Sequence, residues 1–286
     1  MQNYEEKFNK ALRLFDSAEG ILVFSGAGMA YNAGLHTYGN LLHDKFGYFA
    51  DKYLLADIND GFSLVAHEDR EKFFRLYAQV FHFNPPKSPV HKALLSLIRR
   101  KPYFIAQTNP DGIYDNLGVP ADKIMHIAGF PHLLQCASAC NDDLIPMPKD
   151  GAFPVCPVCG GAMRPYLDIY GDDNFVRARE YLVQIREYGA FVSRYKKKRL
   201  LIFELECGRH DHFGFNAHVI TRTLARDCGA FVIRINKYEP IGDFVENFIC
   251  FDESAGKVIA DLLSRRPPAK RGRPSKLKKL FPDKFK

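Results

Sequence analysis

The sequence predicts an α/β protein, a Rossmann-like parallel sheet with an inserted helical module and a second small module marked by paired cysteines. Three observations predict this fold. Short apolar runs alternate with segments of helical periodicity, the pattern of parallel strands joined by helices. An aromatic-rich helical stretch interrupts the alternation at about residues 40–90. Two pairs of cysteines interrupt it again at about residues 133–166.

Six apolar runs are predicted to form the sheet, because each is short, apolar and followed by polar residues or glycine. We expect the strands at residues 21–24, 103–106, 123–127, 200–205, 230–235 and 247–251. We expect helices at residues 4–17, from about 29, within 40–84, and at 89–97, 113–117, 176–195, 214–227 and 254–263. The aromatic side chains within residues 40–84 are interpreted as core and not as cofactor contacts.

The length of 286 residues and a hydrophobic content of 47% fit a globular domain, which we place at residues 1–263. No apolar run approaches the roughly 18 residues of a membrane span, and the polar start of the chain indicates no signal peptide. Seven cysteines, two of them spaced Cys-x-x-Cys, suit a reducing compartment. We therefore expect a cytoplasmic protein without membrane contact, or a nuclear one if the source is a eukaryote.

A basic tail accounts for the positive net charge. Residues 264–286 hold ten Lys or Arg and one acid, so a net charge of +7 for the chain leaves a slightly acidic body. Within the tail, the segment at residues 267–276, with Arg271-Gly272-Arg273-Pro274 at its centre, resembles an AT-hook, an arm that lies in the minor groove of A·T-rich DNA. Weak binding to A·T-rich DNA or to any polyanion is one expectation, and a solvated, disordered tail is the other.

The turn after the first strand is a candidate phosphate loop. Gly26 and Gly28 allow a ligand to approach the backbone, and the helix start that follows offers N–H groups to a pyrophosphate. The spacing Gly-x-Gly-x5-Gly, which ends at Gly34, departs from the common dinucleotide fingerprint. An ordinary strand-to-helix turn is therefore the alternative.

A second candidate loop, Gln107-Thr108-Asn109-Pro110-Asp111-Gly112, follows the strand at 103–106. Open α/β sheets bind ligands past the carboxyl ends of their strands, so Asn109 and Asp111 are candidates for contact with a ribose or an amide. Pro110 restricts Asn109 to non-helical conformations and so fixes the loop. The alternative is that both polar residues only cap the helix that follows.

Four cysteines form the most specific pattern in the sequence. Cys136-x3-Cys140 is followed, after a gap of 15 residues, by Cys156-x2-Cys159 and two glycines. Four thiolates make a closed tetrahedral site with no open coordination position, so the spacing predicts a zinc ribbon whose zinc is structural and not catalytic. The remaining cysteines lie in apolar segments and are interpreted as core thiols.

Taken together and in this order, these motifs resemble the sirtuin family over about residues 20–263. The class M branch, which in microbes often accompanies macrodomains, is the most similar. The segments 133–136, 156–160, 172–176 and 203–205 resemble that branch. The resemblance implies NAD as a substrate and structural zinc.

The resemblance also implies roles by position. Gly26, Ala27 and Gly28 would line the NAD phosphates, and Tyr38 would lie in a mobile loop over the cofactor. Asn109 and Asp111 would face the nicotinamide and its ribose, and Gly208 and Asn236 would touch the adenosine half. The candidate cofactor-binding residues are Gly26, Ala27, Gly28, Gly34, Tyr38, Gln107, Asn109, Asp111, Gly208, Asn236 and Lys237.

One departure from the family concerns the general base. Deacylating sirtuins place a catalytic His before the glycine that is Gly129 here, and class M members place a Gln, whereas this chain has Ala128. His126 lies two residues earlier, and residues i and i+2 of a strand share a face. His126 is therefore a candidate base, and a satisfied polar side chain is the alternative. The candidate catalytic residues are Asn109, Asp111 and His126.

An alanine in place of the base favours mono-ADP-ribosyl transfer over deacylation. Deacylation needs a base to deprotonate a ribose hydroxyl, a contribution of about 10²–10⁴ in rate, whereas an ionised acceptor can attack the ribose carbon directly. We expect a protein acceptor, for which the resemblance implies a lipoylated carrier protein. Two alternatives stay open: an NAD-dependent deacylase or NAD hydrolase that uses His126 or His132, and a degenerate NAD- or ADP-ribose-binding module.

Overall fold

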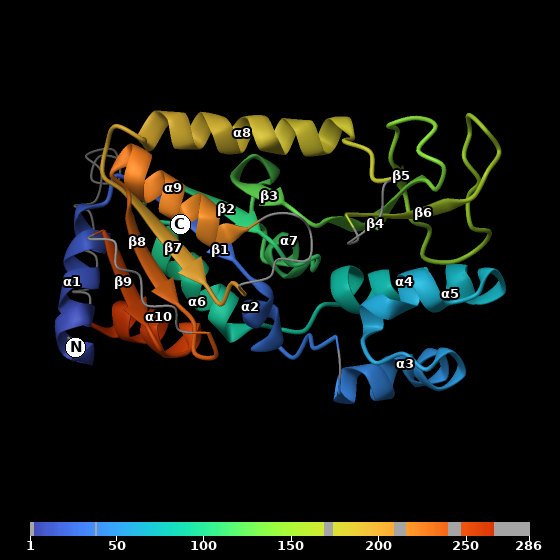
Figure 1. The fold of residues 1–286 in the computed structure, drawn as a ribbon, viewed down its shortest axis with the longest axis horizontal. Helices are drawn as coiled ribbons and strands as arrows, with labels where there is room; N and C mark the ends of the chain where they lie inside the picture. Colours follow the sequence, from blue (N-terminus) through green and yellow to red (C-terminus); the bar gives the residue numbers. More distant parts are fainter. Residues whose placement is uncertain (1–2, 38, 169–173, 209–215, 240–246, 266–286) are drawn as a thin grey trace, which may run out of the picture.

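A six-stranded parallel sheet forms the larger of two bodies in the computed structural model, which describes residues 3–37, 39–168, 174–208, 216–239 and 247–265 (Figure 1). All six predicted strands are confirmed, with ends that differ by at most one residue. In spatial order they are β3 (Ile124–His126), β2 (Tyr103–Gln107), β1 (Gly20–Ser25), β7 (Leu200–Leu205), β8 (Phe231–Ile235) and β9 (Phe248–Phe251).

The direction of the chain across the sheet reverses between β1 and β7. From β1 the chain builds outward to β2 and β3, then returns to add β7, β8 and β9 on the other side of β1. The strand ends are level, because Ser25 lies opposite both Gln107 and Leu205. In sheets of this kind ligands bind in the crevice at the carboxyl ends of the strands, where the order reverses. The crevice between β1 and β7 is therefore where the fold places a ligand.

Helices cover both faces of the sheet, which is why its strands are apolar on both sides. On one face α1 (Tyr4–Ser17), α6 (Pro89–Ile98) and α10 (Ala255–Ser264) pack against side chains such as Val23 and Ile105. On the other face α8 (Arg179–Tyr195) and α9 (Ala217–Cys228) cover the alternate residues of the strands. Two short helices, α2 (Ala27–Tyr31) and α7 (Ile113–Asn116), follow β1 and β2.

The second body combines the helical insertion with the cysteine-containing module. The insertion holds α3 (Asn40–Tyr53), η1 (Ile58–Asp60), α4 (Gly61–Leu64), α5 (His67–Ala78) and a π-helical turn, η2 (Gln79–Phe83). The cysteine module is an antiparallel sheet of β4 (Gly129–Cys136), β5 (Ile145–Pro146) and β6 (Met163–Leu167), with β4 in the middle. A short 3-10 turn, η3 (Ala121–Lys123), precedes β3.

One hydrophobic core serves both inserted modules. Phe46, Phe73 and Tyr77 of the helices pack in the same cluster as Cys156 and Met163 of the cysteine module. The prediction that the aromatic residues of the insertion are core is therefore confirmed for the buried ones. Tyr48 differs, since 49% of it is exposed, and its hydroxyl bonds Asp69.

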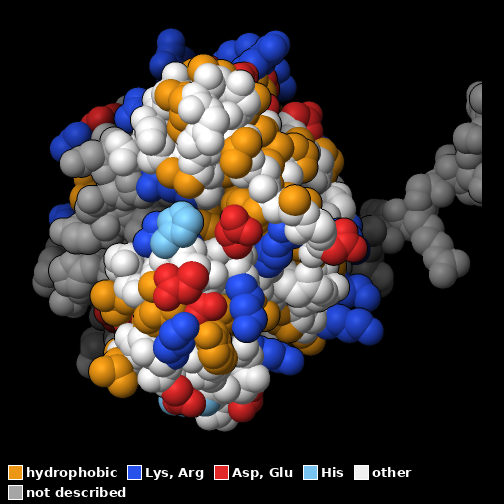
Figure 2. Space-filling model, turned by 90° about the vertical axis from the view of Figure 1, so that its right-hand side faces the viewer, with side chains coloured by type: hydrophobic (Ala, Val, Ile, Leu, Met, Phe, Trp, Pro, Cys, Tyr) orange, Lys and Arg blue, Asp and Glu red, His pale blue; other side chains and the backbone are white. Residues whose placement is uncertain are grey.

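Figure 2 looks at the end of the molecule that these two modules form. Lys and Arg are interspersed with Asp and Glu on this face, and hydrophobic side chains emerge between them in small groups. This mixture gives the face no single-sign field that would steer a charged partner.

Three expectations concern residues that the structure leaves undescribed. Tyr38, most of the basic tail and the AT-hook-like segment lie outside the described residues. Among the helices that are described, none is long and apolar enough to cross a membrane.

Candidate functional site

Most of the predicted site residues meet at the carboxyl edge of the parallel sheet. The Gly26–Gly28 turn follows β1, the loop from Gln107 to Asp111 follows β2, and Gly208 and Asn236 follow β7 and β8. Each is the first irregular segment after a buried strand, so the level strand ends bring four loops together from sequence positions far apart. Gly34 lies just beyond α2, where its φ of +92° favours glycine.

The loop after β2 is fixed by its own polar side chains. Asn109 Nδ2 donates to Asp111 Oδ2 (2.7 Å), and the Ile113 N–H donates to Asp111 Oδ1 (3.0 Å). Gln107 Nε2 donates to the Asp111 carbonyl (3.0 Å). Asp111 therefore caps α7, as the alternative interpretation expected. The contact with Asp111 also fixes the Asn109 side chain, and the Asn109 amide oxygen has no hydrogen-bond partner among the described residues.

Asp111 is the carboxylate of this edge with the most perturbed ionisation. It is 2% exposed, and burial raises its pKa to about 6, although the Asn109 and Ile113 hydrogen bonds pull the other way. At neutral pH the group is mostly ionised although it is buried. A carboxylate in this condition can stabilise positive charge that develops nearby.

The glycines of the first turn are also required by packing within the protein, a reason that the sequence did not indicate. The N–H of Gly26 donates to the Leu205 carbonyl and that of Gly28 to the Glu206 carbonyl. A Cβ at Gly26 would lie 2.3 Å from the Glu206 carbonyl oxygen, and one at Gly28 would lie 2.6 Å from Glu206 Cβ. The turn packs directly on the end of β7, and among the described residues only the Ala27 N–H of this turn is left for an anion.

This packing makes Gly26 intolerant of a side chain. We expect Gly26→Ala to lower the free energy of unfolding by about 1–3 kcal/mol. The added Cβ would clash with backbone atoms of Glu206 and Cys207, which cannot rotate away as a side chain could. Gly189→Ala, inside α8 with nothing within 4 Å of the added carbon, is the matched control and should be neutral or stabilising. Urea unfolding checks both, and equal effects of the two variants would contradict the packing argument.

The loops after β7 and β8 are tied to each other. Asn236 Nδ2 donates to the Cys207 carbonyl (2.8 Å), and its Oδ1 accepts the N–H groups of Tyr238 and Glu239. Asn236 is thus buried and used within the protein, whereas Lys237 beside it is exposed. The side chain of Asn236 shapes the crevice, and Lys237 and Gly208 remain accessible to a ligand.

Sequence reasoning missed Glu206, which lies in the same crevice. Its φ is +50°, and it is 4% exposed. Its Oε1 accepts the Ala255 N–H at the start of α10 (2.8 Å). The available clue was an acidic residue directly after a predicted buried strand, where a ligand loop was already expected.

His126 is bonded at both ring nitrogens. Its Nε2 lies 3.1 Å from Asp115 Oδ2 in α7, and its Nδ1 lies 3.3 Å from Gln184 Nε2 in α8. Gln184 Oε1 also accepts the His126 backbone N–H. The amide donor fixes the ring proton on Nε2, where it donates to Asp115. Both ring nitrogens are therefore engaged, as in the alternative of a satisfied polar side chain, and the ring does not point into the crevice between β1 and β7.

His126 instead lines a cavity of about 740 Å³ between β3, β4 and α8. His82 and His132, which stack at 3.6 Å between ring centroids, line the same cavity. Burial lowers the pKa of both rings, and that of His132 to about 4, so both are neutral at physiological pH. His82 was missed by sequence reasoning, because nothing in its surroundings in the chain distinguishes it.

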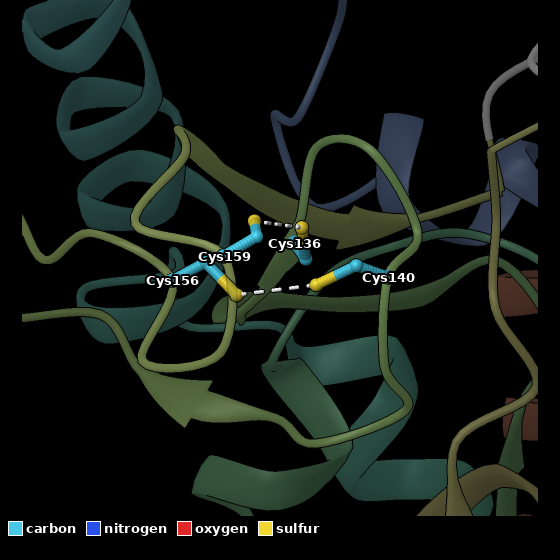
Figure 3. A group of neighbouring side chains, drawn as sticks. All are labelled: Cys136, Cys140, Cys156 and Cys159. Carbon is cyan, nitrogen blue, oxygen red and sulfur yellow. Dashed lines mark hydrogen bonds between the residues drawn. The ribbon is translucent and has the colours of Figure 1, made fainter.

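Figure 3 shows the thiols of Cys136, Cys140, Cys156 and Cys159 converging on one point. All four sulfurs lie within 4.8 Å of one another, with Cys136···Cys159 at 3.7 Å and Cys140···Cys156 at 3.5 Å. Zinc–sulfur bonds of about 2.3 Å place the sulfurs of a tetrahedron roughly 3.8 Å apart. The backbone N–H of Cys159 also holds the pKa of Cys156 at about 6. The donor set and its spacing fit structural zinc, as predicted.

A parallel sheet with ligand loops at its point of reversal, joined to a four-cysteine module, defines a dinucleotide-binding α/β protein with a structural metal. Residues 26–193, more than half of the chain, match the Sir2 family model. The chain therefore belongs to the Sir2, or sirtuin, family, whose enzymes use NAD as a substrate. This confirms the family and the NAD requirement that the sequence motifs indicated.

Curated relatives fall into two groups. A protein ADP-ribosyltransferase of Staphylococcus aureus is 26% identical over 78% of this chain and 75% of its own length. An NAD-dependent protein deacetylase of Thermodesulfovibrio yellowstonii is 24% identical over 91% of this chain and 96% of its own length. Both activities are thus found among proteins similar to this one.

Solved structures share the fold. A complex described as Sir2 with a p53 peptide and NAD+ superposes with a TM-score of 0.59 at 15% identity, covering 90% of this chain and 97% of the other. A mutant Sir2 homologue with 2′-O-acetyl ADP-ribose gives a TM-score of 0.59 at 19% identity, covering 89% and 94%.

Proposed function

We propose that this chain is an NAD-dependent protein mono-ADP-ribosyltransferase. The observation that carries the proposal concerns the position before Gly129, where, among the described residues, neither Ala128 nor His126 offers a free base. Ala128 is a buried methyl group, and both nitrogens of His126 are engaged by Asp115 and Gln184. The similarity to the S. aureus ADP-ribosyltransferase supports the same choice.

The transfer step needs no proton acceptor on the enzyme. The acceptor atom bonds to C1′ of the nicotinamide ribose, and the bond from C1′ to the nicotinamide nitrogen breaks. Its electron pair returns to the ring, and nicotinamide leaves as a neutral molecule. An ionised carboxylate or thiolate brings no proton, so orientation and electrostatics supply most of the rate.

Asn109 and Asp111 are the residues we assign to this step. The free Asn109 oxygen would accept a hydrogen bond from the ribose or from the nicotinamide amide. Asp111, kept ionised in its buried loop, would stabilise the positive charge that grows on the ribose as the glycosidic bond stretches. We assign Gly26, Ala27, Gly28, Gly34, Tyr38, Gln107, Gly208, Asn236 and Lys237 to the remainder of the NAD site.

The acceptor we propose is an ionised side chain on a protein, and the class M resemblance implies a lipoylated carrier. Deacylation of a protein is the second candidate, because the T. yellowstonii deacetylase matches over most of both chains. His132 is the imidazole of the neighbouring cavity that such a reaction would use. The two reactions can be distinguished by their products, because transfer leaves ADP-ribose on a protein and deacylation releases acylated ADP-ribose.

Labelled NAD incubated with the protein and a cell lysate tests the proposal. We expect label to be retained on protein, and we expect Asn109→Ala and Asp111→Asn each to reduce labelling by about 10²–10³. Asp122→Asn, an exposed acid before β3, is the control and should change little. Label released only as free or acylated ADP-ribose would favour deacylation or hydrolysis. Undiminished labelling by Asn109→Ala would refute the site assignment.

A further inference from the structure

We propose that Glu206 sets the affinity of this enzyme for NAD, because its carboxylate occupies the crevice that the diphosphate must cross, so that the dinucleotide binds together with a proton. This inference rests on the proposed placement of NAD between β1 and β7.

The backbone directs the Glu206 side chain into the crevice. Glu206 comes directly after β7, and its φ of +50° is unusual for a residue with a side chain. The side chain consequently lies on the first turn of α2, where Oε2 would be 3.3 Å from a carbon added at Gly28. A left-handed conformation of this kind costs about 1–3 kcal/mol, and glycine would adopt it freely. The position thus has a backbone conformation that favours glycine, yet it carries a glutamate.

The partners of the carboxylate are donors that suit an anion. Oε1 accepts the Ala255 N–H at the start of α10. The backbone of Lys237 and the side chain of Asn32 also act to lower the pKa of the carboxyl group. Helix starts and loop N–H groups are what a phosphate binds in such folds. The carboxylate is thus held as an anionic ligand would be, at the position where the diphosphate is expected.

A second anion cannot enter beside an ionised Glu206 without cost. Burial already raises the pKa of Glu206, and its hydrogen bonds and the charge of Lys237 oppose that rise. Lys237 approaches from the loop after β8, and α10 contributes the N–H of Ala255. The neutral Asn32 lies directly after α2, and residues 26–30 carry no titratable side chain. Two phosphate charges nearby would raise the pKa further. Binding would therefore draw a proton onto Glu206.

The sign of the pH effect follows from this linkage. Above the pKa of Glu206 in the free protein, each unit of pH should weaken NAD binding by up to about tenfold, because a proton must be taken up with the ligand. Below that pKa the affinity should level off. Without an ionisable group at residue 206 this dependence should disappear.

Isothermal titration of NAD at several pH values between 5.5 and 8.5 tests the inference, in two buffers of different ionisation enthalpy. For the wild-type protein we expect affinity to fall with pH and proton uptake to approach one at high pH. Glu206→Gln, which keeps the shape of the side chain, should bind at least tenfold more tightly at pH 8 and take up no proton at residue 206. Glu206→Gly should do the same, and thermal unfolding should show it folded, because the relieved backbone strain offsets the lost Ala255 hydrogen bond.

Glu253→Gln is the matched control, since this acid lies close to Glu206 in the fold, just before α10, and pairs with Lys257 at the surface. It should behave as the wild type does. Equal affinity, pH dependence and proton uptake in wild type and Glu206→Gln would overturn the inference while leaving NAD binding intact. A failure of all four folded proteins to bind NAD at any pH would overturn the proposed function and this inference together.

Discussion

Replacement of Cys156 by serine is expected to strip the chain of zinc and to disrupt the second body of the molecule. Structural zinc contributes on the order of 10 kcal/mol to the folding of small zinc modules. Here the four sulfurs meet between the end of β4 and the knuckle at residues 156–159. We expect zinc content to fall from about one to near zero per chain.

The damage should extend into the helical insertion. Cys136 and Cys156 are members of the same core cluster as Phe46 and Phe73, so losing the metal uncovers aromatic surface in α3 and α5. Metal analysis and thermal unfolding measure the two effects. Cys228→Ser, in α9 and outside the cluster, is the control and should keep its zinc. A Cys156→Ser protein that retains one zinc and the wild-type melting temperature would contradict the assignment.

Replacement of Arg234 by methionine is expected to have the largest effect within the parallel sheet. Arg234 in β8 lies opposite Glu204 in β7, with hydrogen bonds of 2.8 and 3.0 Å to the two carboxylate oxygens. Thr221 donates to Glu204 Oε2 (2.6 Å), and His218 Nδ1 lies 2.5 Å from Oε1. Both side chains of the ion pair are almost fully buried. Removing one partner of such a pair costs about 3–5 kcal/mol.

The loss should depend on pH in a defined direction. Burial raises the pKa of Glu204, but hydrogen bonds from His218 and Arg234 and the charge of Arg234 outweigh it, so the pKa lies below its ordinary value. The pair therefore stabilises the wild type above the unfolded pKa of about 4.3, and this contribution is lost as pH falls through the folded pKa. In Arg234→Met the opposing effect of the guanidinium is gone, so burial raises the pKa of Glu204. The variant should then be less destabilised at pH 5 than at pH 8.

Urea unfolding at the two pH values measures this difference. The double variant Glu204→Leu/Arg234→Met should recover most of the stability, because it leaves no charge in the sheet. Arg226→Met, which removes an exposed ion pair with Asp227, should cost less than about 1 kcal/mol. A loss in Arg234→Met as small as that of Arg226→Met would show that Glu204 is not left with an uncompensated buried charge.

The strands and the metal site could be predicted because each depends on neighbouring residues in the chain. The run Leu200–Leu205 is apolar because helices cover both faces of the sheet, and the knuckle at residues 156–159 needs only the correct local spacing. The roles of His126 and of the glycines could not be predicted in this way. His126 is bonded by Gln184, 58 residues later, and Gly26 is required by Glu206, 180 residues away along the chain.

The buried pair of Glu204 and Arg234 could be predicted in part. Each charged residue interrupts a predicted buried strand, and a buried charge requires a partner, so the pairing was deducible in principle. What the sequence could not supply was the register that places the two side by side. The position of Glu206 in the crevice likewise depends on how β7 ends against α2.

The core that the two insertions share also sets an order of events during synthesis. Aromatic side chains of α3 and α5 are made well before Met163, with which they pack. At about 5–20 residues per second, these side chains stay without their final cover for on the order of ten seconds after the helices leave the ribosome. The nascent chain would thus expose a hydrophobic surface that chaperones can bind until Cys156 and Cys159 have emerged and zinc can complete the module.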